Sequence, residues 1–146
     1  KYNFTYDLLI LPKHLHYAAE FVKRFPKQNF VIDHLAKPNF KANDFSEWER
    51  GISELALHKN VYCKVSGMVT EADWKNWKAA DFNYCLDVLV SNFGIDRLMF
   101  GSDWPVSLLA ASYEESTAIV KNYFSKFSRQ DQDKIWGANA MKFYNL

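Results

Sequence analysis

The chain has 146 residues, 49% of them hydrophobic and 17% aromatic, so it can build one sizeable core and is not a disordered tail. Its formal net charge of +1, without a basic stripe, argues against nucleic acid and anionic membranes as partners. No stretch approaches the roughly 18 apolar residues of a membrane span, and no signal peptide is visible. Cys63 and Cys85 lie far apart without a CxxC motif, which predicts free core thiols and a cytoplasmic protein.

Short apolar segments alternate with segments of helical periodicity along the whole chain. Two of the expected helices open with capping boxes, Asp44 with Glu47 and Ser112 with Glu115, and a third ends at Gly94. The predicted strands are residues 4–11, 29–36, 60–67 and 96–103. The predicted helices are residues 13–25, 43–58, 79–94 and 112–124, followed by one or two short closing helices within 128–146.

This alternation predicts an α/β fold made of parallel βαβ units. Two architectures compete, a four-stranded doubly wound sheet and half of an eight-stranded TIM-type (β/α)8 barrel. The phosphate-binding loop of a nucleotide-binding sheet is missing, since the chain has five glycines and neither GxGxxG nor GxxxxGK. We therefore favour half of a barrel. The chain also starts without Met, which indicates a piece of a longer protein.

The third predicted strand has a polar face. Tyr62, Lys64 and Ser66 alternate with apolar neighbours, because successive side chains of a strand point to opposite faces. In a parallel barrel the polar face points to the axis, and active sites lie at the carboxyl-terminal mouth. Lys64 is then expected to point into the mouth. The alternative is a lysine whose ammonium group reaches solvent.

Two other predicted strands end on side chains that can take part in catalysis or bind a metal ion. The same alternation puts His34 on the face of Phe30 and Ile32, and Asp103 on the face of Met99. An imidazole and a carboxylate at one mouth suit either metal ligation or general-base and electrophilic work on a carbonyl group. The alternatives are a hydrogen-bonded core histidine and an aspartate that caps the following turn.

Five further residues are conspicuous. Asp33 lies on the opposite face from His34 in this scheme and is expected to be structural. His14 and His16 stand two residues apart at a helix start, where they point in different directions and are expected at the surface. Trp74 and Trp77 belong to a polar loop and are either a lid over a sugar-like ring or packing anchors.

Six blocks of the sequence occur in a characteristic order: TYDLLI, FVIDHLAKP, VYCKVSGM, TEADW, RLMFGSDWPV and NAMKFYNL. Together they resemble the amidohydrolase-related family of the amidohydrolase superfamily. The likeness covers essentially the whole chain and is strongest to the lactonase branch that includes L-fuconolactonase and 2-pyrone-4,6-dicarboxylate lactonase. It implies a (β/α)8 barrel in which the four strands are the fifth to the eighth. Residues 1–146 then correspond to the C-terminal half of the barrel domain.

The resemblance implies a hydrolase that opens a sugar-type lactone or a related carboxylated substrate. Asp103 becomes the general base that activates water, and His34 polarises the lactone carbonyl. In members that use a divalent, zinc-like metal, His34 and Asp103 become its ligands. Substrate contacts are expected from Lys64 and Trp104 at the same mouth, and from Trp74 if its loop forms the lid.

The family has a His-x-His pair at the end of its first barrel strand, and this chain has no strand that supplies it. Half a barrel leaves two open strand edges and an exposed apolar inner surface. We therefore expect a partner, either an N-terminal half or a second copy. Two alternatives to a lactonase remain, a decarboxylase of the same superfamily and an inactive half-barrel that serves as an assembly or binding module.

Overall fold

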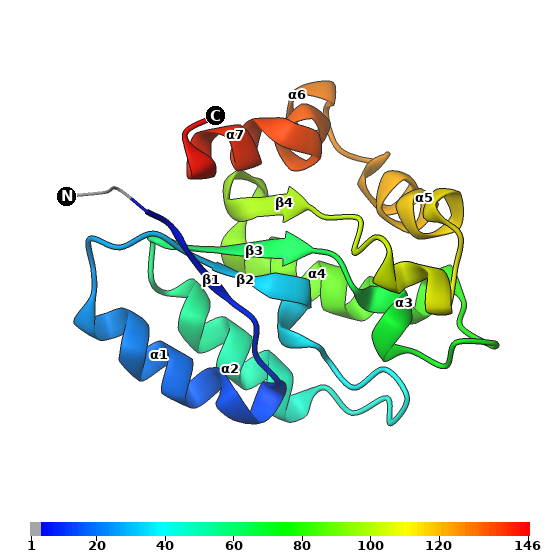
Figure 1. Ribbon diagram of the computed structural model, residues 1–146, viewed down its shortest axis with the longest axis horizontal. Helices are drawn as coiled ribbons and strands as arrows, with labels where there is room; N and C mark the ends of the chain where they lie inside the picture. Colours follow the sequence, from blue (N-terminus) through cyan, green and yellow to red (C-terminus); the bar gives the residue numbers. More distant parts are fainter. Residues whose placement is uncertain (1–3) are drawn as a thin grey trace.

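The computed structural model describes residues 4–146, which form one parallel sheet and its surrounding helices (Figure 1). The strands follow one another across the sheet in the order β1-β2-β3-β4, and each neighbouring pair is parallel. A doubly wound sheet reverses its strand order at a switch point, whereas an arc of a barrel does not. The predicted half-barrel is confirmed. The strands are β1 (Tyr6–Leu8), β2 (Phe30–Ile32), β3 (Val61–Val65) and β4 (Leu98–Phe100).

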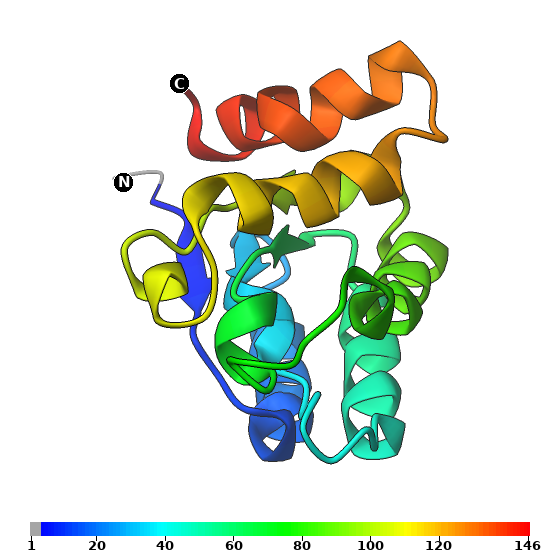
Figure 2. The same cartoon turned by 90° about the vertical axis from the view of Figure 1, so that its right-hand side faces the viewer.

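Helices separate the strands as expected, and both views place α1 and α2 on one side of the sheet and α6 and α7 on the other (Figures 1 and 2). The strands are shorter than predicted, because only the central residues of each predicted segment pair with a neighbouring strand. Helix α3 was not expected, since its sequence has no helical periodicity. The helices are α1 (Leu15–Arg24), α2 (Ser46–Ala56), α3 (Met68–Glu71), α4 (Asn83–Phe93), α5 (Tyr113–Phe124), α6 (Arg129–Asp133) and α7 (Asn139–Tyr144).

The two faces of the sheet are packed differently. Phe30 on one face belongs to the main buried core that the sheet shares with α1, α2 and α4. On the other face, which we call the inner face, Val31 and Met99 form a second buried cluster with Phe143 of α7. The ring centre of Phe143 lies 4.9 Å from that of Tyr62. Helix α7 therefore covers part of the surface that faces the axis of a barrel.

The alternation predicted for β2 is wrong by one residue. Phe30 and Ile32 pack in the main core, so Val31 and Asp33 occupy the inner face instead. All three residues of β2 have fully buried apolar side chains. A continuous apolar run shows no polar–apolar alternation, so the sequence does not tell which residues face the inner side. His34 reaches the barrel mouth by a turn of the backbone rather than by the alternation.

Arg97, just before β4, connects three elements at the amino-terminal ends of the strands, on the side opposite to the barrel mouth. Its guanidinium donates five hydrogen bonds of 2.9–3.2 Å to backbone carbonyl groups. These carbonyls lie at the end of α2, before and at the start of β3, and at the end of α4. A planar group with five N–H donors suits this task, because helix ends leave carbonyls without a partner in the helix. The acceptors are Ala56, His58, Val61, Asn92 and Phe93.

One predicted capping box is confirmed and the other is wrong. At α5, Ser112 Oγ accepts from the amide of Glu115 at 3.1 Å, and Glu115 Oε2 accepts from the amide of Ser112 at 2.8 Å. At α2 the N-cap residue is Phe45, whose side chain offers no cap. Asp44 Oδ1 accepts instead from the amide of Ser46 at 3.1 Å. A carboxylate that accepts from the amide two residues later forms an Asx turn before the helix. The predicted capping box is therefore not formed.

We expect Ser112→Ala to lower the free energy of unfolding by about 1 kcal/mol, because it removes the side-chain acceptor at the start of α5. Chemical denaturation of the variant and the parent protein measures the difference. Ser116→Ala, a serine-to-alanine change inside the same helix, is the matched control and is expected not to destabilise. Equal losses in both variants would contradict a role for the cap.

Strands β1 and β4 each pair with one neighbour among residues 4–146, so the predicted open edges are confirmed in this part of the chain. Apolar side chains are exposed near both edges, as expected for surfaces that a closed barrel would cover. Those near β1 include Phe4, Tyr6 and Leu9, and those after β4 include Trp104, Val106, Leu108 and Leu109.

Cys63 and Cys85 are free and buried, as predicted. Burial raises the pKa of both thiols, so they stay protonated at neutral pH and pack as small apolar side chains. Within residues 4–146, no helix combines the length and the apolar character that a bilayer crossing requires.

Candidate functional site

The backbone turns sharply where β2 ends. His34, Leu35, Ala36 and Lys37 all have positive φ angles, between 52° and 58°. Left-handed backbone costs a non-glycine residue about 1–2 kcal/mol. Four such residues in a row are therefore strained, and strain of this kind persists only where surrounding contacts hold it. The turn carries His34 to the carboxyl ends of β3 and β4.

Contacts from three other parts of the fold hold this left-handed turn. Trp48 Nε1 of α2 donates to the carbonyl of Leu35 at 2.5 Å. The side chains of Leu35 and Ala36 are fully buried in the main core. At the end of the turn, Lys37 Nζ lies 2.6 Å from Glu71 Oε1 of α3. The block DHLAKP thus encodes a strained turn whose packing places a histidine.

Ser66 at the end of β3 orients His34. Its Oγ lies 2.9 Å from Nδ1 of the imidazole, and the serine is only 4% exposed. When the hydroxyl donates to Nδ1, the ring proton resides on Nε2, which faces the mouth. Two glycines make room: a Cβ at Gly67 would lie 2.8 Å from His34 Cβ, and one at Gly101 would lie 3.0 Å from Ser66 Cβ.

Asp103 follows β4 with a φ of 55°, and its side chain is 10% exposed. Thr70 Oγ1 of α3 lies 3.1 Å from Asp103 Oδ2 and 2.8 Å from the carbonyl of Gly67. The hydroxyl has one proton, and an ionised carboxylate is the stronger acceptor. Thr70 therefore holds one carboxylate oxygen. The other, Oδ1, faces His34 Nε2 at 3.7 Å.

The structure thus brings together the two residues predicted to be catalytic. A separation of 3.7 Å is too long for a direct hydrogen bond between His34 and Asp103. An oxygen atom beside the line that joins them can be about 2.8 Å from both. A carboxylate at such a place can take a proton from water, and an imidazole N–H can stabilise negative charge on a carbonyl oxygen.

Lys64 lies on the inner face, as predicted, but its ammonium group is engaged by two carboxylates. Its Nζ is 2.6 Å from Asp7 Oδ2 and 2.7 Å from Asp33 Oδ1. Burial lowers the pKa of Lys64, but hydrogen bonds to Asp33, Asp7 and Tyr144 outweigh burial and raise it overall. Lys64 therefore stays protonated and forms ion pairs with the exposed Asp7 and the partly buried Asp33. Asp33 has the structural contact expected of it, although on the inner face.

The two loop tryptophans have different surroundings. Trp77 Nε1 donates to the carbonyl of Ala110 at 2.9 Å and the side chain is partly buried, so it is a packing anchor. Trp74 Nε1 donates to the carbonyl of Thr70 at 2.8 Å, while the residue remains 46% exposed. Lys41 Nζ lies 5.6 Å from the centre of the Trp74 ring. Trp74 is thus anchored to the segment that holds Asp103 while about half of its surface stays exposed.

Three other predicted residues lie at the surface. Trp104 is 63% exposed directly after Asp103. His14 Nδ1 accepts from the amide of Leu11 at 3.2 Å, in the turn that leads into α1. The side chain of His16 is 71% exposed. His14 is partly buried and His16 is exposed, and within residues 4–146 neither belongs to a group of three or more metal-ligating side chains.

Sequence reasoning missed three residues that hold the pair in place. Ser66 had a signal, since it shares the polar face of Lys64 and lies two residues nearer the mouth. Thr70 and Glu71 stand in the block TEADW of the family resemblance, but their roles could not be predicted, because the segment has no periodicity and its contacts come from distant parts of the chain.

All residues of the chain, 1–146, match the family model described as Amidohydrolase. An L-fucono-1,5-lactonase from Burkholderia multivorans is 39% identical over 154 residues, which cover 99% of this chain and 52% of the relative. An amidohydrolase from the same species, solved with bound zinc, has a TM-score of 0.92 at 39% identity, and the match covers 98% of this chain and 53% of that one. The chain spans about half the length of these proteins.

A more distant structure from Pseudomonas putida, described as a 2-pyrone-4,6-dicarboxylic acid hydrolase, has a TM-score of 0.80 at 19% identity. It covers 98% of this chain and 52% of its own, and at this identity it shows the fold alone. The likeness to L-fucono-1,5-lactonase in sequence and to a 2-pyrone-4,6-dicarboxylic acid hydrolase in fold is therefore confirmed.

The zinc of the Burkholderia structure raises the question of whether these residues fit a metal. A catalytic zinc ion takes three protein ligands. His34 and Asp103 are two, and residues 4–146 contain no group of three or more histidine, cysteine or acidic side chains placed to hold a metal ion. The described residues therefore do not form a zinc site by themselves. A zinc ion at this pair needs ligands from elsewhere.

The strand order, the pair of His34 and Asp103 at the strand ends and the sequence match all indicate half of an amidohydrolase barrel. The match includes every residue of the chain, and the solved relatives cover it with the same fold. The chain belongs to the Amidohydrolase family and corresponds to the C-terminal half of its barrel.

Proposed function

We propose that the full-length protein that contains this chain hydrolyses the lactone of a sugar acid. The observation that carries the proposal is the pair of His34 Nε2 and Asp103 Oδ1, which lie 3.7 Å apart after the carboxyl ends of β2 and β4. This pair suits carbonyl chemistry with water. The substrate class comes from the relatives named L-fucono-1,5-lactonase and L-rhamnono-gamma-lactonase, which match most of the chain.

In this reaction Asp103 Oδ1 takes a proton from water, and the oxygen attacks the carbonyl carbon of the lactone. Negative charge develops on the carbonyl oxygen, where His34 donates the hydrogen of Nε2. The bond between the carbonyl carbon and the ring oxygen then breaks. Protonated Asp103 returns its proton to the ring oxygen, which becomes a hydroxyl group. The product is an open hydroxy acid, which ionises at neutral pH.

The surrounding residues support these roles. A hydrogen bond donated by Ser66 to Nδ1 leaves the imidazole proton on Nε2, and Thr70 holds Asp103 Oδ2 so that Oδ1 faces the substrate. We place Trp74 and Trp104 against the substrate, because both expose their rings near the mouth. Lys64 is paired with Asp7 and Asp33 deeper on the inner face and holds these two carboxylates in place.

Acid release from a hexono-1,5-lactone tests the proposed reaction. We expect the full-length protein to release one proton for each lactone opened near pH 7, measured as base consumption in a pH-stat. If the protein instead releases carbon dioxide from a carboxylated substrate and opens no lactone, the decarboxylase alternative is correct and the lactonase proposal is wrong. The two free, buried thiols suit a reducing compartment, and we place the protein in the cytoplasm.

Ser66→Ala is expected to lower kcat about tenfold with a smaller effect on KM, because the imidazole loses the group that selects its tautomer. Nitrogen-15 NMR of the histidine ring should show a mixture of tautomers in the variant and one tautomer in the parent protein. Ser125→Ala, at an exposed serine after α5, is the matched control. An unchanged kcat together with a single tautomer would remove Ser66 from this role.

We further propose that the edges at β1 and β4 are covered in the full-length protein by the remaining strands of the barrel. The exposed apolar side chains near both edges support this interface. Residues 1–146 expressed alone should self-associate, and the full-length protein should be monodisperse in light scattering. An isolated chain that stays a folded monomer would overturn the interface. A monodisperse homodimer of full-length protein without lactonase activity would favour the binding-module alternative.

A further inference from the structure

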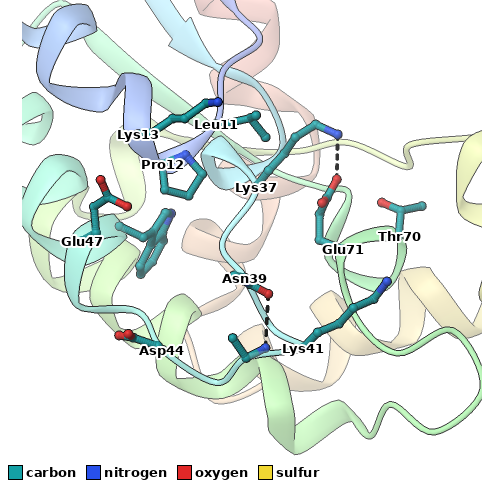
Figure 3. A pocket seen from close by; sticks show the side chains of 12 residues that line it. Leu11, Pro12, Lys13, Lys37, Asn39, Lys41, Asp44, Glu47, Thr70 and Glu71 are labelled. Atoms are coloured by element: carbon teal, nitrogen blue, oxygen red, sulfur yellow. Dashed lines mark hydrogen bonds and ion pairs between the residues drawn. The ribbon is translucent and has the colours of Figure 1, made fainter.

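A cavity of about 540 Å³ opens between the loops that follow β1, β2 and β3 (Figure 3). Its volume lies in the range of small-molecule sites. Leu11 and Pro12 line it after β1, several residues of the loop and helix after β2 line a second wall, and Thr70 and Glu71 of α3 line a third. All of these segments follow the carboxyl ends of strands, where barrel enzymes bind their substrates.

Two residues connect this cavity to the catalytic pair. Thr70 lines the cavity, and its hydroxyl lies 3.1 Å from Asp103 Oδ2. Lys37 lines it as well and ends the left-handed turn that begins at His34, where its amide donates to the His34 carbonyl at 2.7 Å. A molecule in the cavity is therefore adjacent to the segments that hold both catalytic side chains.

The wall of the cavity carries as many positive as negative groups. A ligand with two negative charges finds no net attraction there, whereas a neutral polyol meets hydrogen-bond donors and acceptors together. Leu11 and Pro12 supply an apolar strip on which the C–H face of a sugar can pack. The three ammonium groups belong to Lys13, Lys37 and Lys41, and the three carboxylates to Asp44, Glu47 and Glu71.

Lys37 and Glu71 meet at the wall nearest to Thr70 (Figure 3). Their Nζ to Oε1 distance is 2.6 Å, and their side chains are 31% and 27% exposed. An ammonium group has three donors and a carboxylate has two oxygens, so this single contact leaves two donors and one oxygen for a ligand. Neighbouring hydroxyl groups of a sugar need such a donor and acceptor side by side.

We propose that this cavity is the subsite for the hydroxyl groups of the lactone, and that the ion pair of Lys37 and Glu71 sets the preference for polyhydroxylated lactones over unsubstituted ones. This inference rests on the proposed lactonase function.

The test compares two lactones in the full-length protein and in the double variant Lys37→Met/Glu71→Met. Removing both charges leaves no unpaired charge behind. We expect the ratio of kcat/KM for a hexono-1,5-lactone to kcat/KM for δ-valerolactone to fall about tenfold, because sites that hydrogen-bond a hydroxyl discriminate against analogues without it. Lys121→Met, the same lysine-to-methionine change on an exposed position of α5, should keep the parent ratio.

If the double variant is folded and the ratio of the two kcat/KM values is unchanged, the proposed subsite is wrong. Circular dichroism checks the fold, and Glu71→Gln, which keeps the shape of the side chain, replaces the double variant if that variant is unfolded. A parent protein that opens neither lactone would overturn the proposed function instead. Calorimetric binding of gluconate then tests the subsite separately: about tenfold weaker binding to the variant supports it, and equal binding overturns it.

Discussion

Asp103→Asn is expected to lower kcat for lactone opening by about 10²–10⁴-fold in the full-length protein. The amide has nearly the shape of the carboxylate, and its oxygen can still accept the hydrogen bond of Thr70. It cannot take a proton from water at neutral pH, so the general base is lost while the position of the side chain is kept. Initial rates in a pH-stat measure the loss, and thermal denaturation verifies that the variant is folded.

Asp133→Asn is the matched control for this prediction. Asp133 lies on α6 with a side chain that is 56% exposed, and its ion pair with Arg129 is on the surface. The same change of carboxylate to amide there is expected to leave kcat at the parent value. Activity of the Asp103→Asn variant within a few-fold of the parent protein would show that another group activates the water.

Arg97→Met is expected to lower the free energy of unfolding by about 3 kcal/mol. The change removes five hydrogen bonds from a charged group to backbone carbonyls, some of which cannot reach water after the change. Chemical denaturation measures the difference. Arg97→Lys should recover only part of the loss, because a lysine has three donors and lacks the planar fork.

Arg129→Met provides the control for an arginine on the surface. Its side chain is 85% exposed, and its ion pair with Asp133 joins residues one helical turn apart. Exposed pairs of this kind contribute about 0–1 kcal/mol. A loss in Arg97→Met no larger than in Arg129→Met would mean that the carbonyls around Arg97 find other donors.

The repeating order of strands and helices was predictable because each element leaves a periodic trace in its own residues. Apolar runs marked the strands, helical spacing marked the helices, and Ser112 with Glu115 marked the start of α5. The Asp44 box failed because its prediction rested on residue types alone. Whether a carboxylate caps a helix or closes a turn depends on where the helix begins, and Phe45 occupies that position here.

The two principal residues of the site could be predicted from the sequence, but the residues that hold them in place could not. His34 and Asp103 follow strands, and parallel strands bring their carboxyl ends to one edge. The route of His34 was not predictable, since four residues with positive φ follow β2 and none is glycine. Such a turn exists because Trp48, Ser66 and Glu71 hold it, and these contacts join residues 13 to 34 positions apart.

Three features could be predicted from the residues alone: the βα repeat, the resemblance to the amidohydrolase-related family, and the strand-end residues His34 in FVIDHLAKP and Asp103 in RLMFGSDWPV. Local periodicity and residue chemistry suffice for these, because they depend on neighbours along the chain. Only the tertiary structure decided which face of β2 is inner, which oxygen of Asp103 is free, and that Lys37 meets Glu71 beside a cavity. These features arise from contacts between distant segments, whose distances exist only after the core has packed.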